Sequence, residues 1–443
     1  MRKFLILGLL AVFPALAASG QGRPSAREEI GQDIRKAAGV FYLYDFSRDA
    51  TIKSPRGYKP FYVSHYGRHG ARRHSTEADL VAVDSVFEQA HLAGNLTEKG
   101  ERFRAAFKEL YAQSRYHAGD LTEKGREQHK EIARRMFHNF PQVFKGRPVV
   151  DARATLSTRC IISMASFCNE LIALNPSVRV HEESSYSDMG RLSVFHPMQP
   201  QFLDFDDGLS KKGPWYKDYS KFFNSLDHKS FLKKYFKDVS GISREANLTR
   251  QMYYMFCSGP CLDSPVYFWD VIDQDDAFNY WEAFNFRFYS AMASWPANKG
   301  RKPALAWILL DDIVSRADED IATGGTQARL RFGHDIVLMS FMDLMGAEGW
   351  DRVVTDPHKA KEVFRTYDVP MASNIQFAFY RGRKGDVIVR VLYNGNDLPL
   401  PVEKADVSGG KALGLFYEWP VLRAYFIDRI ASAKALLAST GSR

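Results

Sequence analysis

Apolar runs and amphipathic stretches follow one another along the first part of the chain. A compact apolar run at 59–64 is typical of a buried strand, which a glycine-rich turn ends at Gly67. Apolar and charged residues then recur at helical spacing over 76–91. The segment 148–155 predicts a second buried strand, and 157–174 predicts the helix after it. This part of the chain therefore indicates strands that alternate with helices.

The pattern changes in the middle of the chain. Residues 176–300 are aromatic-rich and loop-bearing with helical pieces, which predicts an inserted, mainly helical lobe. Regular α/β patterning returns with the apolar run 303–310, and 386–395 is a further strand with a turn. We therefore expect an α/β core over 19–175 and 301–443. Its mostly parallel central sheet should be flanked by helices on both faces.

A short motif occurs twice in the first part of the chain. Gly94–Gly100 (GNLTEKG) and Gly119–Gly125 (GDLTEKG) differ only at their second position. Each copy precedes an amphipathic stretch, and the Thr in each copy is a natural N-cap. The repeat predicts two similar helix entries and not a solenoid.

The N-terminal segment has a pattern of its own. Arg2 and Lys3 precede an apolar run from Phe4 to Leu16, and small residues follow. This is typical of a secretory signal peptide over 1–18, because the run is too short to span a bilayer. A buried N-terminal helix is the alternative. No later apolar stretch is long enough for a span, so the sequence predicts a periplasmic or secreted protein without a transmembrane segment.

Composition limits the classes of partner. The 443 residues are 45% hydrophobic and 14% aromatic, as expected of a folded globular protein. The formal net charge of +8 favours anionic small molecules, anionic surfaces or nucleic acid. No Lys/Arg run is interleaved with aromatic residues, so nucleic acid is not an expected partner. A small phosphorylated substrate fits this charge, and the oligomeric state is not indicated.

The cysteines allow one disulfide. Cys257 and Cys261 could close a short loop, which an oxidising compartment permits. Cys160 and Cys168 would lie about two helical turns apart, too far to pair. We interpret these two as small buried core residues. No His pair sits at ligand spacing near the cysteines, so a zinc site is not predicted.

The segment Ser64–His74 carries the strongest chemical signal. It lies at the carboxyl end of a predicted strand, where open α/β sheets usually place their ligands. Arg68 and Arg72 flank His69, and Gly70 follows it directly. Guanidinium groups bind phosphoryl oxygens bidentately, and glycine lets the backbone approach closely. A histidine among such groups can attack phosphorus, although a basic surface turn is the alternative for so short a motif.

Four motifs in order resemble branch two of the histidine phosphatase superfamily. This branch holds histidine acid phosphatases, phytases and multiple inositol polyphosphate phosphatases. The motifs are Arg68–Arg72 (RHGAR), Leu121–Gln128 (LTEKGREQ), Thr158–Phe167 and Gly333–Asp335 (GHD). The match covers roughly residues 57–175 and 303–400. The resemblance implies a phosphoglycerate-mutase-like core.

The resemblance also implies a role for each site residue. His69 would be the nucleophile that becomes phosphohistidine. Asp335 would be the general acid that protonates the leaving alkoxide, which predicts an acidic pH optimum. The pocket for the transferring phosphoryl group would consist of Arg68, Arg72, Arg159 and His334. Because arginines supply the positive charge, no metal or other cofactor is implied.

Two departures leave the subfamily open. Arg73 and His74 stand where the family often has a proline two residues after the second arginine. The pair His334-Asp335 resembles acid phosphatases and phytases, since inositol polyphosphate phosphatases commonly have His-Ala-Glu there. By contrast, 370–374 and 389–394 resemble the inositol polyphosphate phosphatases. Organic phosphate monoesters are the expected substrates, and inositol polyphosphates such as phytate would suit a basic protein.

Other interpretations stay open. The chain could be an inactive phosphate-binding protein of the same fold, a metal-dependent phosphohydrolase or an intracellular phosphoryl mutase. The presence of both a nucleophile and an acid argues against the first, and the leader argues against the last. Taken singly, Arg159 could be an ordinary helix-start arginine, and His334 and Asp335 could cap a helix.

Overall fold

The computed structural model describes residues 23–50, 52–193, 211, 213–407 and 414–440. The predicted leader over 1–18 lies outside the described residues. An eight-stranded sheet has the order β3-β2-β4-β1-β5-β6-β7, and β8 pairs with β6. The strands are β1 (Lys59–Arg68), β2 (Val149–Ala154), β3 (Arg179–Glu183), β4 (Ala328–Gly333), β5 (Asn374–Arg381), β6 (Val387–Tyr393), β7 (Asn396–Asp397) and β8 (Phe416–Glu418).

The sheet changes direction at its centre. Strands β3, β2, β4 and β1 are parallel, whereas β5 runs antiparallel to β1 and begins the antiparallel half. The predicted α/β fold with a parallel sheet core and flanking helices is confirmed. The strand predicted at 386–395 is β6, and its turn places Asn394 and Gly395 at positive φ, 46° and 73°. Two consecutive residues at positive φ are typical of the tight turn that joins antiparallel strands.

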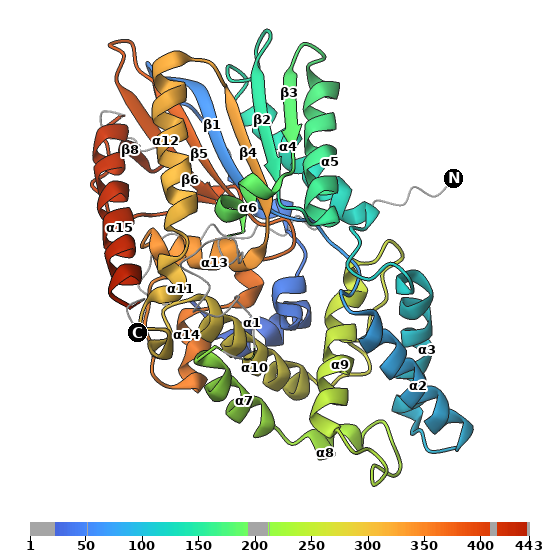
Figure 1. Ribbon diagram of the computed structural model, residues 1–443. Helices are drawn as coiled ribbons and strands as arrows, with labels where there is room; N and C mark the ends of the chain where they lie inside the picture. Colours follow the sequence, from blue (N-terminus) through green and yellow to red (C-terminus); the bar gives the residue numbers. More distant parts are fainter. Residues whose placement is uncertain (1–22, 51, 194–210, 212, 408–413, 441–443) are drawn as a thin grey trace, which may run out of the picture.

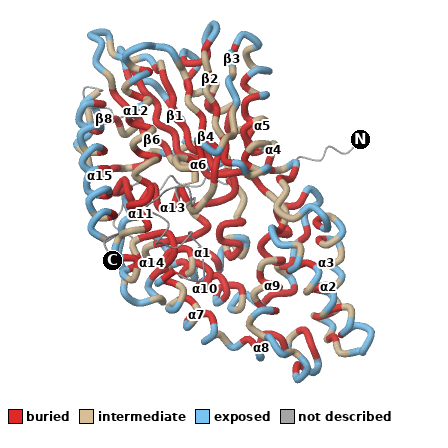
Figure 2. Tube along the Cα trace, viewed as in Figure 1, coloured by how far each residue is buried: buried red, intermediate tan, exposed pale blue. Residues whose placement is uncertain are grey.

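Helices cover both faces of the sheet (Figure 1). One hydrophobic cluster joins α4 (Glu123–Asn139) and α5 (Thr158–Leu174) to Val150, Leu330 and Phe332. The other joins α12 (Trp307–Thr323) and α15 (Trp419–Thr440) to the opposite sheet face. Strand β1 contributes to both clusters, because Tyr62 and Val63 point to opposite faces. Most of β1 is buried (Figure 2). A strand that is buried on both faces has a continuous apolar run in its sequence, and this is why the sequence predicts β1.

A mainly helical region lies beyond one end of the sheet (Figure 1). The helices not yet named are α1 (Ala26–Gln32), α2 (Glu77–Leu92), α3 (Glu98–Ser114), α6 (Tyr186–Leu192), α7 (Trp215–Asn224), α8 (His228–Leu232), α9 (Glu245–Ser258), α10 (Gln274–Met292), α11 (Arg301–Ala304), α13 (Asp335–Leu344) and α14 (Ala360–Val363). In the helical region α2 and α3 lie beside α9, and α7 packs against α10. The inserted lobe proposed over 176–300 stays a prediction; β3, which lies within those residues, pairs with β2 of the sheet.

The repeated motif forms two similar helix entries, as predicted. The Thr97 side chain accepts a hydrogen bond from the Gly100 backbone at the start of α3, and Thr122 accepts one from Gly125 at the start of α4. Each hydroxyl satisfies a backbone N–H that has no partner within the helix. The motif therefore encodes an N-cap twice.

One strand prediction was wrong. Residues 303–310, where we expected the α/β pattern to resume, belong to α11 and α12. Ile313, Val314 and Ala317 continue the buried stripe at helical spacing, so the apolar run is one face of a helix. The strand that follows in the chain is β4, which the sequence pattern did not predict. Its buried Arg331 alternates with apolar residues and pairs with Asp312 at 2.7 Å.

The cysteines are all free thiols. The disulfide that Cys257 and Cys261 could form is absent, and both thiols are buried near the backbone carbonyls of Ala37 and Phe41. Cys160 and Cys168 lie in the core between α5 and the sheet, as predicted. None of the described helices is long and apolar enough to cross a membrane.

Phe332 tests the packing between the sheet and α5. Its side chain is fully buried, and its ring contacts those of His65, His129 and Phe167. We expect Phe332→Ala to lower the free energy of unfolding by about 3–5 kcal/mol, because it removes buried area and leaves a cavity. The exposed Val353 is a control, and Val353→Ala should change stability by less than about 0.5 kcal/mol. Equal unfolding midpoints for the two variants, in urea or on heating, would contradict this packing.

Candidate active site

Three neighbouring parallel strands bring the predicted site residues to one edge of the sheet. His69 directly follows β1, and His334 and Asp335 directly follow β4. Arg159 is the second residue of α5, which follows β2. Because the carboxyl ends of parallel strands meet at the same edge, these side chains converge although they are far apart in the sequence.

A cavity of about 690 Å³ opens at this edge. It is lined by five of the six predicted site residues, namely His69, Arg72, Arg159, His334 and Asp335. Arg68 lies behind the cavity wall, with only 1% of its side chain exposed. The structure therefore brings all six into one neighbourhood, with Arg68 beneath the others.

The His69 ring is oriented by its own loop. Its Nδ1 lies 2.9 Å from the Gly70 carbonyl oxygen. Because a carbonyl only accepts hydrogen bonds, Nδ1 carries the proton and Nε2 keeps its lone pair. The ring is almost completely buried and lies edge-on to the His334 ring, with centroids 5.7 Å apart. His69 thus has the tautomer that a nucleophilic Nε2 requires.

Burial and positive charge keep His69 neutral. Burial lowers the pKa of His69 well below its usual 6.5, and the guanidinium groups of Arg68 and Arg159 lower the pKa further. A neutral imidazole has the free electron pair that an attack on phosphorus needs. The cations that would bind a phosphoryl group therefore also keep His69 unprotonated.

Arg68 holds the candidate acid. Its Nη2 pairs with Asp335 Oδ2 at 2.9 Å, and its Nη1 donates to the carbonyl oxygens of Val40 and Val369. Burial raises the pKa of Asp335, but Arg68 and His334 outweigh it, so the pKa lies below the ordinary 3.8. In the free protein Asp335 is therefore an ionised carboxylate at neutral pH.

Arg72 and Arg159 have unused hydrogen-bonding capacity. The Nε atoms of both are buried without a hydrogen-bond partner, and neither side chain forms an ion pair with the described residues. The Arg72 guanidinium lies over the Phe41 ring and donates to the Arg73 carbonyl. Burial and the charges of Arg159 and Arg68 lower its pKa to about 10, so it remains a cation. Two cations beside His69 are thus open to an anionic ligand.

His334 and Asp335 lie at the start of α13. His334 is the N-cap residue, and its backbone N–H donates to the Tyr66 hydroxyl at 3.2 Å. Burial and the neighbouring Arg159 lower the pKa of His334 to about 3, so its ring is neutral. The positive end of the helix dipole favours negative charge at this position. A phosphoryl group would therefore meet a helix N-terminus as well as the arginines.

Two glycines fix the loop that carries His69 against α4. A side chain at Gly70 would place its Cβ 2.3 Å from the Gly125 carbonyl oxygen, and a Cβ at Gly125 would lie 2.3 Å from the Ala71 oxygen. Only glycine allows so close a backbone approach. The motifs at 68–72 and 121–128 are thus two halves of one contact.

Further positioning residues come from the same motifs. Gln128 Oε1 accepts a hydrogen bond from the Ala71 backbone at 2.8 Å, and Ser163 Oγ accepts one from Gly70 at 3.2 Å. Sequence reasoning assigned neither residue a role. Gln128 ends the second motif and could have been found there, whereas Ser163 is an inconspicuous helix residue. Both hold the loop that carries His69.

Three residues near the motif lie outside the phosphoryl site. His65 is fully buried between Phe167 and Phe332, and burial lowers its pKa to about 3. His74 lines the rim of the cavity and faces Asp79 at 3.3 Å. Arg73 turns away to Asp263 and to the Gln113 carbonyl. Among the described residues, no group of three or more His, Cys, Asp or Glu side chains is arranged to hold a metal ion.

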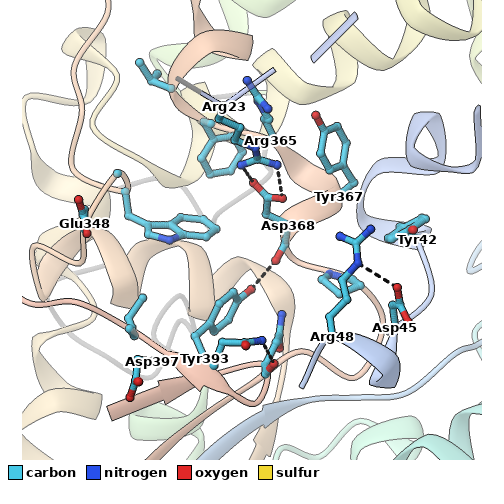
Figure 3. A pocket seen from close by; sticks show the side chains of 18 of the residues that line it. Arg23, Tyr42, Asp45, Arg48, Glu348, Arg365, Tyr367, Asp368, Tyr393 and Asp397 are labelled. Atoms are coloured by element: carbon cyan, nitrogen blue, oxygen red, sulfur yellow. Dashed lines mark hydrogen bonds and ion pairs between the residues drawn. The ribbon is translucent and has the colours of Figure 1, made fainter. Parts of the chain in front are cut away.

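A second cavity of about 710 Å³ offers a contrast (Figure 3). It is also lined by arginines, but Arg23 pairs with Asp368 at 2.6 Å and Arg48 with Asp45 at 2.9 Å. Its positive charge is thus largely neutralised by neighbouring carboxylates. The cavity at His69 differs because two of its arginines, Arg72 and Arg159, form no ion pair with any described carboxylate, which makes it the stronger candidate for anion binding.

Comparisons with solved structures agree with this architecture. The multiple inositol polyphosphate phosphatase of Bifidobacterium longum, in complex with phosphate, matches with a TM-score of 0.72 over 89% of this chain and 98% of that chain, at 17% identity. Its complex with inositol hexasulfate matches with a TM-score of 0.68 over 87% and 96%, also at 17% identity. The phytase from D. castellii matches with a TM-score of 0.67 over 90% of this chain and 85% of that chain, at 13% identity.

These likenesses define the fold of the chain. It has the fold of multiple inositol polyphosphate phosphatases and phytases, as the resemblance of the sequence motifs implied. The amino-acid sequence itself matches no family model and no curated protein. The chemistry of this chain is therefore argued from its own side chains.

Gly125 tests the contact between the two motifs. We expect Gly125→Ala to destabilise the fold by about 1–3 kcal/mol, because the added Cβ overlaps the Ala71 carbonyl. A displacement of His69 by about 1 Å should also lower catalytic activity about a hundredfold. Gly241 has no atom near its virtual Cβ, so Gly241→Ala is the matched control. Normal melting and activity in Gly125→Ala would show that the glycines are not interlocked.

Proposed function

We propose that the protein is a phosphomonoesterase that transfers the phosphoryl group of an organic ester to His69 and then to water. The observation that carries this proposal is the neutral His69 ring, whose Nε2 shares a cavity with two cations free of carboxylate partners. Phosphoryl transfer depends mainly on positioning and charge stabilisation, and this arrangement supplies both.

In the first step, His69 Nε2 attacks phosphorus and the ester P–O bond breaks. Arg72, Arg159 and His334 would bind the non-bridging oxygens, whose negative charge the guanidinium groups stabilise. Positive charge develops on the imidazole as the P–N bond forms. The Gly70 carbonyl oxygen, which accepts a hydrogen bond from the Nδ1–H group, stabilises that charge.

Asp335 would protonate the leaving alkoxide. An alkoxide is a poor leaving group, so a proton must arrive as the bond breaks. Arg68 keeps the carboxylate ionised in the free protein, but a bound phosphoryl group brings negative charge that raises its pKa. At acidic pH a monoanionic ester can also carry the proton into the site, since phosphate monoesters lose their second proton near pH 6. Both effects favour an acidic optimum.

In the second step, water attacks the phosphohistidine. The Asp335 carboxylate accepts a proton from this water as the P–O bond forms and the P–N bond breaks. Inorganic phosphate leaves, and His69 returns to its neutral state with Nδ1 still protonated. The carboxyl group ends the cycle with the proton that it gave up in the first step.

The proposed substrates are small, negatively charged esters. The net charge of +8 favours them, and inositol polyphosphates such as phytate are a dense example. The Bifidobacterium longum protein in the two complexes above is named an inositol polyphosphate phosphatase, which supports the same substrate class here. The pattern of residues 1–18 supports export to the periplasm or the medium.

Two substitutions test the assigned roles. We expect His69→Ala to reduce phosphate release to about the background rate, because it removes the proposed nucleophile. Asp335→Asn should lower kcat about 10²- to 10⁴-fold on alkyl phosphates and less than tenfold on aryl phosphates, whose leaving groups need no proton. Rates of phosphate release, and trapping of labelled phosphohistidine by an alkaline quench that leaves the acid-labile P–N bond intact, measure both effects.

The same assay separates the alternatives. Equal losses in Asp335→Asn on both kinds of ester would remove Asp335 from the role of acid. A wild-type protein that binds phosphate but releases none from any ester would be an inactive binding protein. Activity that a chelator abolishes and added metal restores would indicate the metal-dependent hydrolase.

The pH dependence of His69 phosphorylation tests its electrostatic setting. An ordinary imidazole with a pKa of 6.5 would be about 97% protonated at pH 5 and would lose its nucleophilic form. Because the pKa of His69 is far lower, its neutral form should stay populated. We therefore expect single-turnover phosphorylation by an aryl phosphate, corrected for protonation of the ester itself near pH 6, to be nearly constant between about pH 7 and pH 5. A corrected decline of about 25-fold over that interval would contradict the lowered pKa.

A further inference from the structure

The His334 ring has one nitrogen that faces the protein and one that is open to a ligand. Its Nε2 lies 3.4 Å from the Thr155 hydroxyl oxygen and 3.9 Å from Cys160 Sγ. Its Nδ1 has no hydrogen-bond partner among the described residues and is not sealed from solvent, and the ring lines the cavity at His69. The two nitrogens therefore have different surroundings.

A neutral imidazole can donate from only one of these nitrogens. The lowered pKa of about 3 keeps the His334 ring neutral, with a single N–H group. A phosphoryl oxygen only accepts hydrogen bonds, so His334 binds it only when the proton is on Nδ1. Nε2 then has a lone pair that needs a donor from within the protein. A proton on Nε2 would instead direct the Nδ1 lone pair at the phosphoryl oxygen, and the two would repel each other.

Cys160 does not supply the donor for Nε2. Its thiol lies 3.2 Å from the Gly333 carbonyl oxygen, and because a carbonyl only accepts, the single S–H proton is used there. The Thr155 hydroxyl can rotate toward Nε2 and donate to it. Among the described residues, no third side chain hydrogen-bonds to this nitrogen. The geometry thus leaves Thr155 as the donor.

The sheet fixes Thr155 beside the His334 ring. Thr155 directly follows β2 and is fully buried. Its backbone N–H donates to the Phe332 carbonyl of β4 at 3.0 Å, and its carbonyl oxygen accepts a hydrogen bond from Ser184 Oγ at 3.2 Å. His334 follows β4, which pairs with β2. Two neighbouring strands therefore hold the hydroxyl and the ring together before a ligand arrives.

We propose that Thr155 is a positioning residue, which donates a hydrogen bond to His334 Nε2 and thereby directs the ring proton to Nδ1 for the transferring phosphoryl group. This inference rests on the proposed function, because it concerns how His334 holds that group. Thr155 itself touches no substrate and acts only through the ring. The phosphoryl group would then meet an N–H donor from His334 beside the two arginines.

The first test measures the ring tautomer directly. The protein carries isotope-labelled histidine and is saturated with inorganic phosphate, and nitrogen NMR shows which ring nitrogen bears the proton. The spectrum of His334→Asn, which lacks the His334 signals, assigns them. We expect the proton on Nδ1 in the wild type. In Thr155→Val, which has nearly the same shape but no hydroxyl, we expect it on Nε2.

The second test measures the effect on binding and turnover. Thr155→Val should weaken the binding of inorganic phosphate and lower kcat/KM on an alkyl phosphate, each about 10- to 100-fold, because a charge-assisted hydrogen bond is lost. Thr155→Ser retains the hydroxyl and should keep the proton on Nδ1. Both of its values should stay within about threefold of those of the wild type.

Two control variants separate the hydroxyl from its surroundings. Cys160→Ala removes the other group beside Nε2 and should keep the proton on Nδ1, since the thiol proton is already used. Thr249→Val removes an equally buried hydroxyl, which lies 2.8 Å from Nδ1 of His228 and does not line the cavity. It should lower stability as Thr155→Val does, but leave kcat/KM within about threefold of that of the wild type.

Several results would overturn the role of Thr155. One is a proton on Nε2, or on both nitrogens of His334, in the wild-type phosphate complex, a measurement that needs no variant to fold. Others are an unchanged tautomer in Thr155→Val, a shifted tautomer in Cys160→Ala, or equal losses of kcat/KM in Thr155→Ser or Thr249→Val.

Failure of the proposed function gives a different result. A wild type that binds phosphate but releases none from any ester would contradict the phosphomonoesterase, while the tautomer in the phosphate complex still decides the role of Thr155. A wild type that binds no phosphate would refute both.

Discussion

The whole site depends on one constraint. The guanidinium groups of Arg72 and Arg159, which form no ion pair with the described residues, must be held beside the buried imidazole of His69. Such charge repels itself and opposes folding, so it persists only where the rest of the structure holds it in place. The arrangement also decides the state of the histidine. The same guanidinium groups that would bind a phosphoryl group lower the pKa of His69 and keep its Nε2 unprotonated. Anion binding and nucleophilicity therefore have a single electrostatic cause.

The fold maintains this constraint through backbone contacts more than through side chains. Strands β1, β2 and β4 are buried and parallel, so their carboxyl ends present the site residues from fixed positions. The loop after β1 is further fixed by the close approach of Gly70 to Gly125, and by the hydrogen bonds of Gln128 and Ser163 to the loop backbone. Arg68 is held by carbonyl oxygens from two other segments, which fixes the position of Asp335 in turn.

The sequence predicts the parts of this structure whose cause is local. Strands β1 and β6 are largely apolar because both of their faces are buried, β2 alternates buried with half-buried positions, and Thr97 and Thr122 are recognisable caps. The residues gathered at His69 follow from short motifs at strand ends. The failures have a different cause. Strand β4 contains two arginines whose charges are matched by Asp312 and Asp320 from α12, a compensation visible only in three dimensions.

The unpaired arginines also have a consequence for turnover. A pocket that attracts a phosphoryl dianion before the reaction attracts the inorganic phosphate that remains afterwards, because the charges facing it do not change. Dissociation of this product would then compete with chemistry as the slowest step, and accumulated phosphate would occupy the site against fresh ester. Protonation of the product to its monoanion weakens that hold, so the acidity that helps the leaving group depart would also help to empty the pocket.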